Sequence, residues 1–203
     1  GGRVETREID AMRLEQLFLG GAGGQRGGTA EEFQPAALAH QVHGDRIIET
    51  DEASGWVIHD GADGHLSRRG GVLLLVTVAD CVPVYLLAPG QRTVMLLHAG
   101  WRGTAAGILA RGVERLGRAG VRPDEIVMHA GVAISGPCYE VGAEVMAGMG
   151  QPAEGPGPWH LDIRAVLAEQ AVSLGIAEVT VSGHCTSRQN EAFFSHRASG
   201  GRD

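Results

Sequence analysis

A cysteine and a histidine on the two strands of a predicted β-hairpin are the strongest chemical signal in this sequence. Cys81 begins one apolar segment and His98 ends the next, with the turn sequence Pro89-Gly90 between them. A two-residue loop would place Cys81 directly opposite His98. A four-residue loop would pair Pro83 with His98 and make Cys81 its diagonal neighbour. Either register puts the thiol and the imidazole on one face, about 4.5–8 Å apart at the backbone.

A thiol and an imidazole at this separation can share a metal ion or exchange a proton. Taken singly, each residue is more often part of an ordinary core. Two further histidines, His40 and His43, lie in the sequence HQVHG. Their odd spacing points them to opposite faces of an extended chain, so only one of them can join Cys81 and His98. The alternative is a metal-free thiol hydrolase, with Cys81 as nucleophile and His98 as base.

The sequence HAGWRG leads from His98 into a predicted helix that begins near Thr104. Free backbone N–H groups and the helix dipole favour an anion at such a helix start. Arg102 would add a planar guanidinium suited to phosphate or carboxylate. Trp101 could stack on a flat ring, although a tight turn with a packed tryptophan is the alternative.

The elements that position these residues predict a layered α/β or α+β domain with a mixed sheet and flanking helices. The continuous apolar segment from Val72 to Val78 is typical of a strand buried on both faces. The hairpin strands are expected over 82–88 and 93–98. Further strands are expected near 40–48, 56–59, 125–134, 178–182 and 190–197, and helices over 31–39, 104–116, 139–149 and 162–174.

Length and composition are those of one globular domain spanning residues 1–203, within which residues 1–33 give no clear pattern. The net charge of −7 argues against a general nucleic-acid binder. All 17 basic residues are arginine. The absence of lysine excludes Schiff-base chemistry and a Walker-type phosphate loop.

Three widely spaced cysteines without a CxxC motif suggest no disulfide framework, so we expect a reducing cytoplasm. No segment approaches the ~20 apolar residues of a membrane helix. The sequence also lacks the GxGxxG, GxSxG and HExxH motifs. Their absence argues against dinucleotide dehydrogenases, common serine hydrolases and zinc peptidases.

Six short motifs resemble, in order, those of the YfiH-type family, long labelled polyphenol oxidase or laccase-domain proteins. They are HQVHG (40–44), VADCVPV (78–84), HAGWRG (98–103), ISGPCYEV (134–141), LDI (161–163) and CT…NEAFFSHR (185–197). The resemblance runs from His40 to Arg202 and implies a YfiH-like fold. It also implies a purine nucleoside phosphorylase that uses adenosine, inosine or methylthioadenosine with phosphate, and an adenosine deaminase activity.

The resemblance further implies a zinc ion held by His43, Cys81 and His98, which selects His43 over His40. Three protein ligands with one open position are typical of catalytic zinc. In phosphorolysis, phosphate oriented by Arg102 would attack the ribose C1′ while the purine leaves. In deamination, zinc-activated water would attack C6 of adenine.

Other side chains are expected around this site with less definite roles. Glu140 and Asp63 are candidate proton carriers, and the spacing does not choose between them. Asp80 is a poor metal ligand because it faces the other side of an ideal strand. Arg197 is the next candidate for the substrate pocket, with Phe193 and Phe194 as an apolar wall, although a buried phenylalanine pair is more often part of the core.

Two features depart from the family pattern, and a third does not fit the family's older name. The N-terminal third lacks the family's usual segment, and relatives continue beyond Asp203. A multicopper oxidase needs a large set of histidine ligands, typically in HxH pairs. This chain has nine histidines and no HxH pair, so copper is the less favoured metal.

Overall fold

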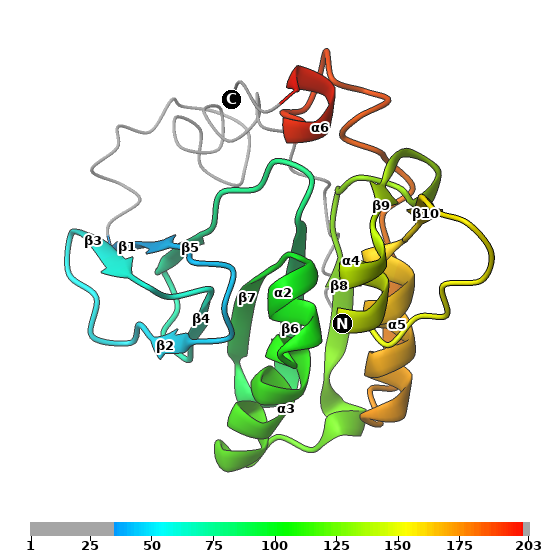
Figure 1. Ribbon diagram of the computed structural model, residues 1–203. Helices are drawn as coiled ribbons and strands as arrows, with labels where there is room; N and C mark the ends of the chain where they lie inside the picture. Colours follow the sequence, from blue (N-terminus) through cyan, green and yellow to red (C-terminus); the bar gives the residue numbers. More distant parts are fainter. Residues whose placement is uncertain (1–34, 201–203) are drawn as a thin grey trace.

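The structure is a computed structural model that describes residues 35–200, and a six-stranded mixed sheet forms its centre (Figure 1). The strand order is β11-β8-β6-β7-β4-β2. Strand β6 pairs antiparallel with both β7 and β8, whereas β2–β4 and β11–β8 are parallel pairs. The predicted mixed sheet is therefore confirmed. The strands are β2 (Ile47–Glu49), β4 (Gly64–Ser67), β6 (Val82–Ala88), β7 (Thr93–Ala99), β8 (Val127–Ala130) and β11 (Glu178–Val181).

The central hairpin of β6 and β7 has the register of the longer loop. Ala88 pairs with Thr93 and Pro83 with His98. The connection is a 3₁₀ turn, η2 (Pro89–Gln91), followed by Arg92 in the left-handed region at φ 51°. Cys81 is thus the diagonal neighbour of His98 and not its direct partner.

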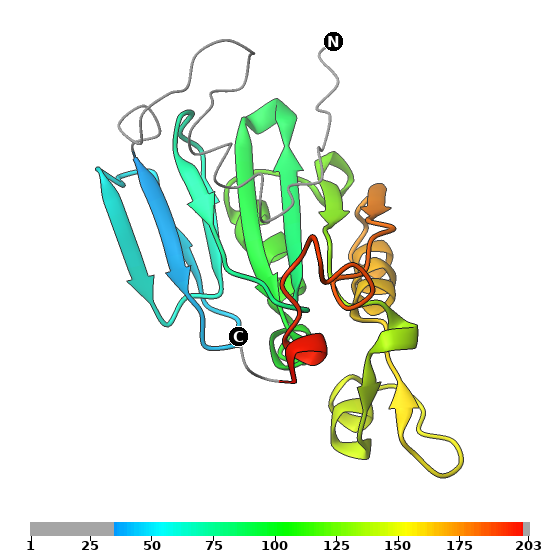
Figure 2. The ribbon, with the colours of Figure 1, turned by 90° about the horizontal axis from the view of Figure 1, so that it is seen from above.

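A second, three-stranded parallel sheet lies beside the β4 end of the large sheet (Figure 2). It contains β1 (Ala36–His40) between β3 (Trp56–Asp60) and β5 (Leu73–Leu75), with β1 contacting β4 and β5 contacting β7. Two predictions were wrong here. Residues 36–39 form a strand and not a helix, because pairing on both sides overrides the helix propensity of alanine. Of the segment 72–78, only 73–75 is a strand, and it is half-buried.

Helices cover one face of the six-stranded sheet (Figure 1). They are α2 (Trp101–Ala105), α3 (Ile108–Arg118), α4 (Ala143–Gly148) and α5 (Ile163–Ser173). Asp162 caps α5, since its carboxylate accepts hydrogen bonds from the Arg164 and Ala165 N–H groups. Within residues 35–200, no helix is long and apolar enough to cross a bilayer.

Three segments differ from the predicted elements. The helix after His98 begins at Trp101, three residues early, and breaks at Gly107, whose φ is 84°. The region 139–149 starts as strand β9 (Glu140–Val141), paired with β10 (Trp159–His160), before α4 begins. The region 190–197 is not a strand, because Ser195 caps a short helix, α6 (His196–Ser199). The expectation for residues 1–33 falls outside the described residues.

Candidate metal centre

The structure brings His43, Cys81 and His98 together at one end of the central hairpin. One ligand atom from each residue lies within 4.8 Å of the others. Cys81 precedes β6, His98 lies near the end of β7, and His43 lies in the loop that follows β1. His43 is exposed, Cys81 is half-buried and His98 is buried. The cluster is therefore closed at His98 and open to solvent at His43.

A buried carboxylate fixes the orientation of His98. Asp63 is fully buried, and its Oδ1 lies 3.0 Å from His98 Nδ1. The Asp63 carbonyl oxygen also accepts a 2.7 Å hydrogen bond from the His98 N–H. A proton on Nδ1 that is shared with Asp63 leaves Nε2 free to bind a metal. Burial lowers the pKa of His98 despite the opposing effect of Asp63, so the imidazole is neutral, as a ligand must be.

The same carboxylate also holds the loop that carries His43. Asp63 Oδ2 accepts hydrogen bonds from Gly44 N at 2.8 Å and Val42 N at 3.3 Å. His43 itself has a φ of 61°, a left-handed conformation that costs about 1–3 kcal/mol outside glycine. The bonds on both sides of His43 hold this conformation, so Asp63 positions both histidines.

Two glycines of HAGWRG make room for the cluster. A Cβ on Gly100 would lie 3.0 Å from Cys81 Sγ and 3.2 Å from His43 Cδ2. A Cβ on Gly103 would lie 2.7 Å from the carbonyl oxygen of Gly44. The start of α2 can therefore approach the His43 loop closely only because both positions lack a side chain.

The environment of Cys81 suits a metal ligand better than a free nucleophile. Burial, together with the negative charges of Asp80 and Asp63, raises the pKa of the Cys81 thiol to about 11. Without a cation beside it, the sulfur is a neutral thiol at neutral pH and a weak nucleophile. A bound metal ion would stabilise the thiolate. The metal-free thiol hydrolase is the less favoured interpretation for this reason.

Asp80 connects the cluster to the C-terminal segment. Its Oδ1 accepts a 2.6 Å hydrogen bond from the Thr186 hydroxyl, and its Oδ2 accepts a 2.7 Å bond from the Arg197 N–H. Its side chain thus points toward this segment. Asp80 itself has a φ of 85° and lies outside any strand, so the strand argument does not apply to it. These two hydrogen bonds hold the C-terminal segment against the residues that precede β6. The segment includes α6, which lies at the top of Figure 1.

Tyr139 joins the candidate anion-binding residues to the cluster. The Arg197 guanidinium lies 5.3 Å from the Tyr139 ring. The pKa of Tyr139 is raised by burial and by the negative charge of a Cys81 thiolate, while Arg197 and Arg102 lower it. The charges of Arg102, Arg197 and Cys81 therefore all affect the pKa of the Tyr139 phenol. No pattern in the sequence singled out Tyr139.

Arg102 and Trp101 lie in the first turn of α2. The Arg102 guanidinium lies 4.4 Å from the Trp101 ring centre. Arg102 is exposed, and within residues 35–200 it makes no ion pair. The half-buried Trp101 packs against the core and against Gly148 of α4. Trp101 and Arg102 thus form a cation–π contact. The stacking of Trp101 on a substrate ring stays a prediction.

The remaining candidates occupy distinct places. Asp63 is inaccessible and both of its carboxylate oxygens are engaged, so it is placed to orient ligands and not to carry protons. Glu140 is exposed in β9. His40 pairs with Asp60 at 2.9 Å on the surface and does not join the cluster. Phe194 is 68% exposed in the segment before α6.

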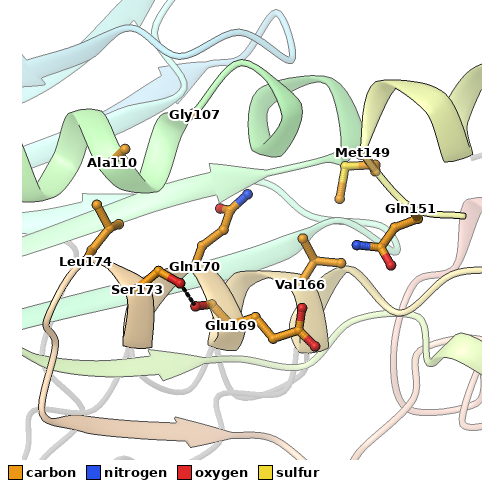
Figure 3. A pocket seen from close by; sticks show the side chains of 9 residues that line it. All are labelled: Gly107, Ala110, Met149, Gln151, Val166, Glu169, Gln170, Ser173 and Leu174. Atoms are coloured by element: carbon orange, nitrogen blue, oxygen red, sulfur yellow. Dashed lines mark hydrogen bonds between the residues drawn. The ribbon is translucent and has the colours of Figure 1, made fainter.

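A shallow cavity of about 450 Å³ lies elsewhere, on the helical side of the sheet (Figure 3). Its lining includes Gly107, Met149, Val166, Gln170 and Leu174 from α3, α4, α5 and their flanks. None of the residues predicted to bind metal, phosphate or nucleoside lines it. The candidate site is thus the open metal cluster and not this cavity.

The comparison with known protein families agrees with the motif resemblance. The family described as "Multi-copper polyphenol oxidoreductase laccase" matches residues 26–203. The chain belongs to this family. Its matched segment contains the whole cluster of His43, Cys81 and His98.

Two relatives carry names that describe purine chemistry. The purine nucleoside phosphorylase YlmD of Geobacillus stearothermophilus is 36% identical over 177 residues, which cover 77% of this chain and 65% of that protein. The adenosine deaminase RL5, from an unknown prokaryotic organism, is 32% identical over 169 residues, which cover 76% of this chain and 63% of that protein. This chain thus spans slightly less than two thirds of the length of either relative.

The fold is that of solved members of the same group. The crystal structure of the Bacillus licheniformis protein YfiH superposes with a TM-score of 0.76 at 31% identity, covering 82% of this chain and 70% of that one. The predicted α+β, YfiH-like fold is therefore confirmed.

Proposed function

We propose that this protein is a zinc-dependent purine nucleoside phosphorylase that also deaminates adenosine. The observation that carries the proposal is the open cluster of His43, Cys81 and His98, with both histidines positioned by Asp63. The names of the two relatives support the reaction class. The substrates would be adenosine, inosine or methylthioadenosine, each with phosphate for phosphorolysis.

The donor set fits zinc. Two neutral imidazoles and one thiol suit this borderline-soft ion in tetrahedral geometry, and three protein ligands leave a position open. When bound, the ion would supply positive charge that orients an anionic oxygen or lowers the pKa of a water molecule. Copper also accepts nitrogen and sulfur ligands, and the family description names it. However, the metal-ligand cluster found in residues 35–200 has three ligands, which is too few for a multicopper centre.

Arg102 and Arg197, whose charges both act on Tyr139, are the proposed phosphate-binding groups. Arg102, at the start of α2, offers a planar guanidinium that makes no ion pair with the described residues. Arg197 donates one hydrogen bond to the Glu140 carbonyl, at 2.9 Å, and retains further N–H groups. Together they would hold phosphate beside the nucleoside and partly neutralise its charge. Glu140 is the proposed proton carrier, because Asp63 is enclosed.

A nucleoside assay with and without phosphate tests this function. Adenosine should give adenine only when phosphate is present, and it should give inosine in either case, because water is the nucleophile at C6. Chromatography separates the two products. A chelator should abolish both activities, and added zinc should restore them. Base release without phosphate dependence, or loss of only one activity on chelation, would contradict a single metal-dependent site.

A further inference from the structure

Two cysteines outside the metal cluster lie in adjoining segments that are held side by side. Cys138 ends the 3₁₀ turn η4 (Gly136–Cys138), and Cys185 follows β11. An isolated β-bridge joins Cys185 to Ala133, and the Thr186 N–H donates to the Ala133 carbonyl at 3.2 Å. Both cysteines are free thiols. The metal site uses neither of them.

The sulfur of Cys185 lies in a nest of hydrogen-bond donors. The backbone N–H of Ser135 donates to Cys185 Sγ at 3.3 Å, and the Ser135 hydroxyl donates to it at 3.1 Å. The backbone of Arg188 and the thiol of Cys138 are further hydrogen-bond partners of this sulfur. Donors that converge on a sulfur stabilise its thiolate form.

The η4 turn begins after Ser135, which donates to Cys185 Sγ, and ends with Cys138, the second thiol. The N–H of Cys138 donates to the carbonyl of Ser135 at 2.9 Å, which closes the turn. Cys138 is half-buried, whereas Cys185 is 5% exposed. Burial raises the pKa of Cys185, but the hydrogen bonds from Ser135, Arg188 and Cys138 outweigh it and lower that pKa to about 7.

We propose that Cys138 and Cys185 are a peroxide-responsive dithiol that closes reversibly to a disulfide. A sulfur that accepts several hydrogen bonds, with a second thiol beside it, is an arrangement in which oxidation can stop at the disulfide. Ser135 and the β-bridge already hold the two segments together. In a reducing compartment the pair rests as thiols.

The oxidant is hydrogen peroxide, and the steps balance. The Cys185 thiolate attacks one peroxide oxygen, so an S–O bond forms, the O–O bond breaks, and the leaving hydroxide takes up the proton that the Cys185 thiol released and becomes water. Cys138 then loses its proton and attacks the sulfenic sulfur. The S–S bond forms, the S–O bond breaks, and the departing hydroxide takes up a proton to become water. Two thiols and one peroxide thus give one disulfide and two waters.

Closure has a consequence for the site, and this consequence rests on the proposed function. Cys138 directly precedes Tyr139, and the Arg197 guanidinium lies over the Tyr139 ring. A disulfide at Cys138 would turn the η4 segment and so shift the Tyr139 ring together with Arg197. Disulfide formation itself does not depend on any nucleoside chemistry, so the two proposals can fail separately.

Peptide mapping of the oxidised full-length chain tests the dithiol directly. Trypsin cleaves after arginine, except before proline, and it places Cys81, Cys138 and Cys185 on three separate peptides, 70–92, 119–164 and 165–188. After treatment with hydrogen peroxide and alkylation of the remaining thiols, mass spectrometry should find 119–164 linked to 165–188. A reducing agent should separate them. Cys138→Ser should abolish the link and leave a dimedone-reactive sulfenic acid on Cys185.

Two serine variants test whether the hydrogen-bond donors around Cys185 Sγ determine its reactivity. Ser135→Ala removes one hydrogen bond to Cys185 Sγ and should slow disulfide formation about threefold to tenfold at neutral pH. Ser173→Ala is the matched control, because that hydroxyl donates to the Glu169 carbonyl on α5, at 3.0 Å, and not to a cysteine. A link that involves Cys81, irreversible oxidation of Cys185 without a link, or three unmodified thiols would overturn the proposal. Equal rates in Ser135→Ala and the parent chain would overturn the role of the nest.

Discussion

Two buried histidines on neighbouring strands differ in whether a carboxylate contacts the ring, and therefore in their suitability as metal ligands. His98 on β7 is 2% exposed, and His65 on β4 is fully buried. The strands pair antiparallel, with His65 opposite Leu96. His98 has the Asp63 carboxylate on its Nδ1 and lies among metal-ligand atoms. Neither ring nitrogen of His65 has a well-formed hydrogen bond to the described residues, although a backbone group of Leu75 acts on the ring.

Burial is common to both histidines, so burial alone does not distinguish them. The His65 ring centre lies 5.4 Å from that of His59, whose Nδ1 is also buried without a partner in the described part of the chain. Burial, with a smaller contribution from the charge of His59, lowers the pKa of His65 to about 4. His65 is thus a neutral core residue that resists protonation. The carboxylate of Asp63 makes the difference, because it orients His98 and engages its second nitrogen.

The largest expected effect comes from removing that carboxylate. Asp63→Asn keeps the size of the side chain but removes its charge and one acceptor oxygen. We expect the metal affinity to fall about 10–100-fold, because both histidines lose their positioning partner. Competition with a chromogenic chelator measures this affinity.

An exposed pair of the same chemistry provides the control. His40 and Asp60 lie 2.9 Å apart, but both side chains are largely exposed and neither belongs to the cluster. Asp60→Asn should leave metal affinity unchanged. Equal affinities for Asp63→Asn, Asp60→Asn and the parent chain would contradict the positioning role of Asp63.

His65 should instead affect stability against acid. Its pKa is lowered in the folded state, so the unfolded chain binds the extra proton first, and stability is lost as pH falls from about 6.5 toward about 4. We expect this one residue to account for about 2 kcal/mol of the stability lost between about pH 7 and about pH 5. His65→Leu should remove that part of the pH dependence, as measured by urea unfolding at the two pH values.

The variant His65→Leu also distinguishes the role of His65 from that of His98. His65→Leu should bind metal as the parent chain does, because the substituted side chain lies outside the cluster. If the unfolding free energies of His65→Leu and the parent chain kept the same pH dependence, the neutral core interpretation of His65 would be wrong.

The smallest expected effect concerns the anion site at the start of α2. Arg102→Lys keeps the positive charge but loses the planar guanidinium. We expect the apparent KM for phosphate to rise about threefold to tenfold, with metal content unchanged. Arg118→Lys on α3 is the matched control, since Arg118 pairs with the exposed Glu114 of the same helix. An Arg102→Lys variant with lowered stability and a normal phosphate KM would return Arg102 to a purely structural role.

The hairpin half of the site was predictable from the sequence, because it depends on local rules. The apolar segments and the Pro-Gly turn between them predicted β6 and β7, and either loop length brought Cys81 near His98. The register still required the structure, because the left-handed Arg92 that closes the longer loop has no strong sequence signal. The start of α5 was also a local feature, since the helix expected over 162–174 begins at the Asp162 cap.

The other half was not predictable, because tertiary contacts create it. Strand β4 has the sequence GHLS, which has weak strand propensity, so nothing indicated that Asp63 would lie opposite His98. The alternation argument for His40 and His43 did not apply either. His43 lies outside β1, in a left-handed loop held by Asp63. Only the resemblance to the YfiH-type family selected it.

The most direct test of the account measures metal content and phosphate-dependent base release in one preparation of Cys81→Ala. Removing the thiolate leaves two imidazoles, so the account predicts loss of stoichiometric zinc and of both purine activities. Circular dichroism should show the fold retained, because Cys81 is half-buried at the edge of the core. A folded Cys81→Ala protein that still held one zinc per chain, or still released adenine from adenosine with phosphate, would contradict the central claim.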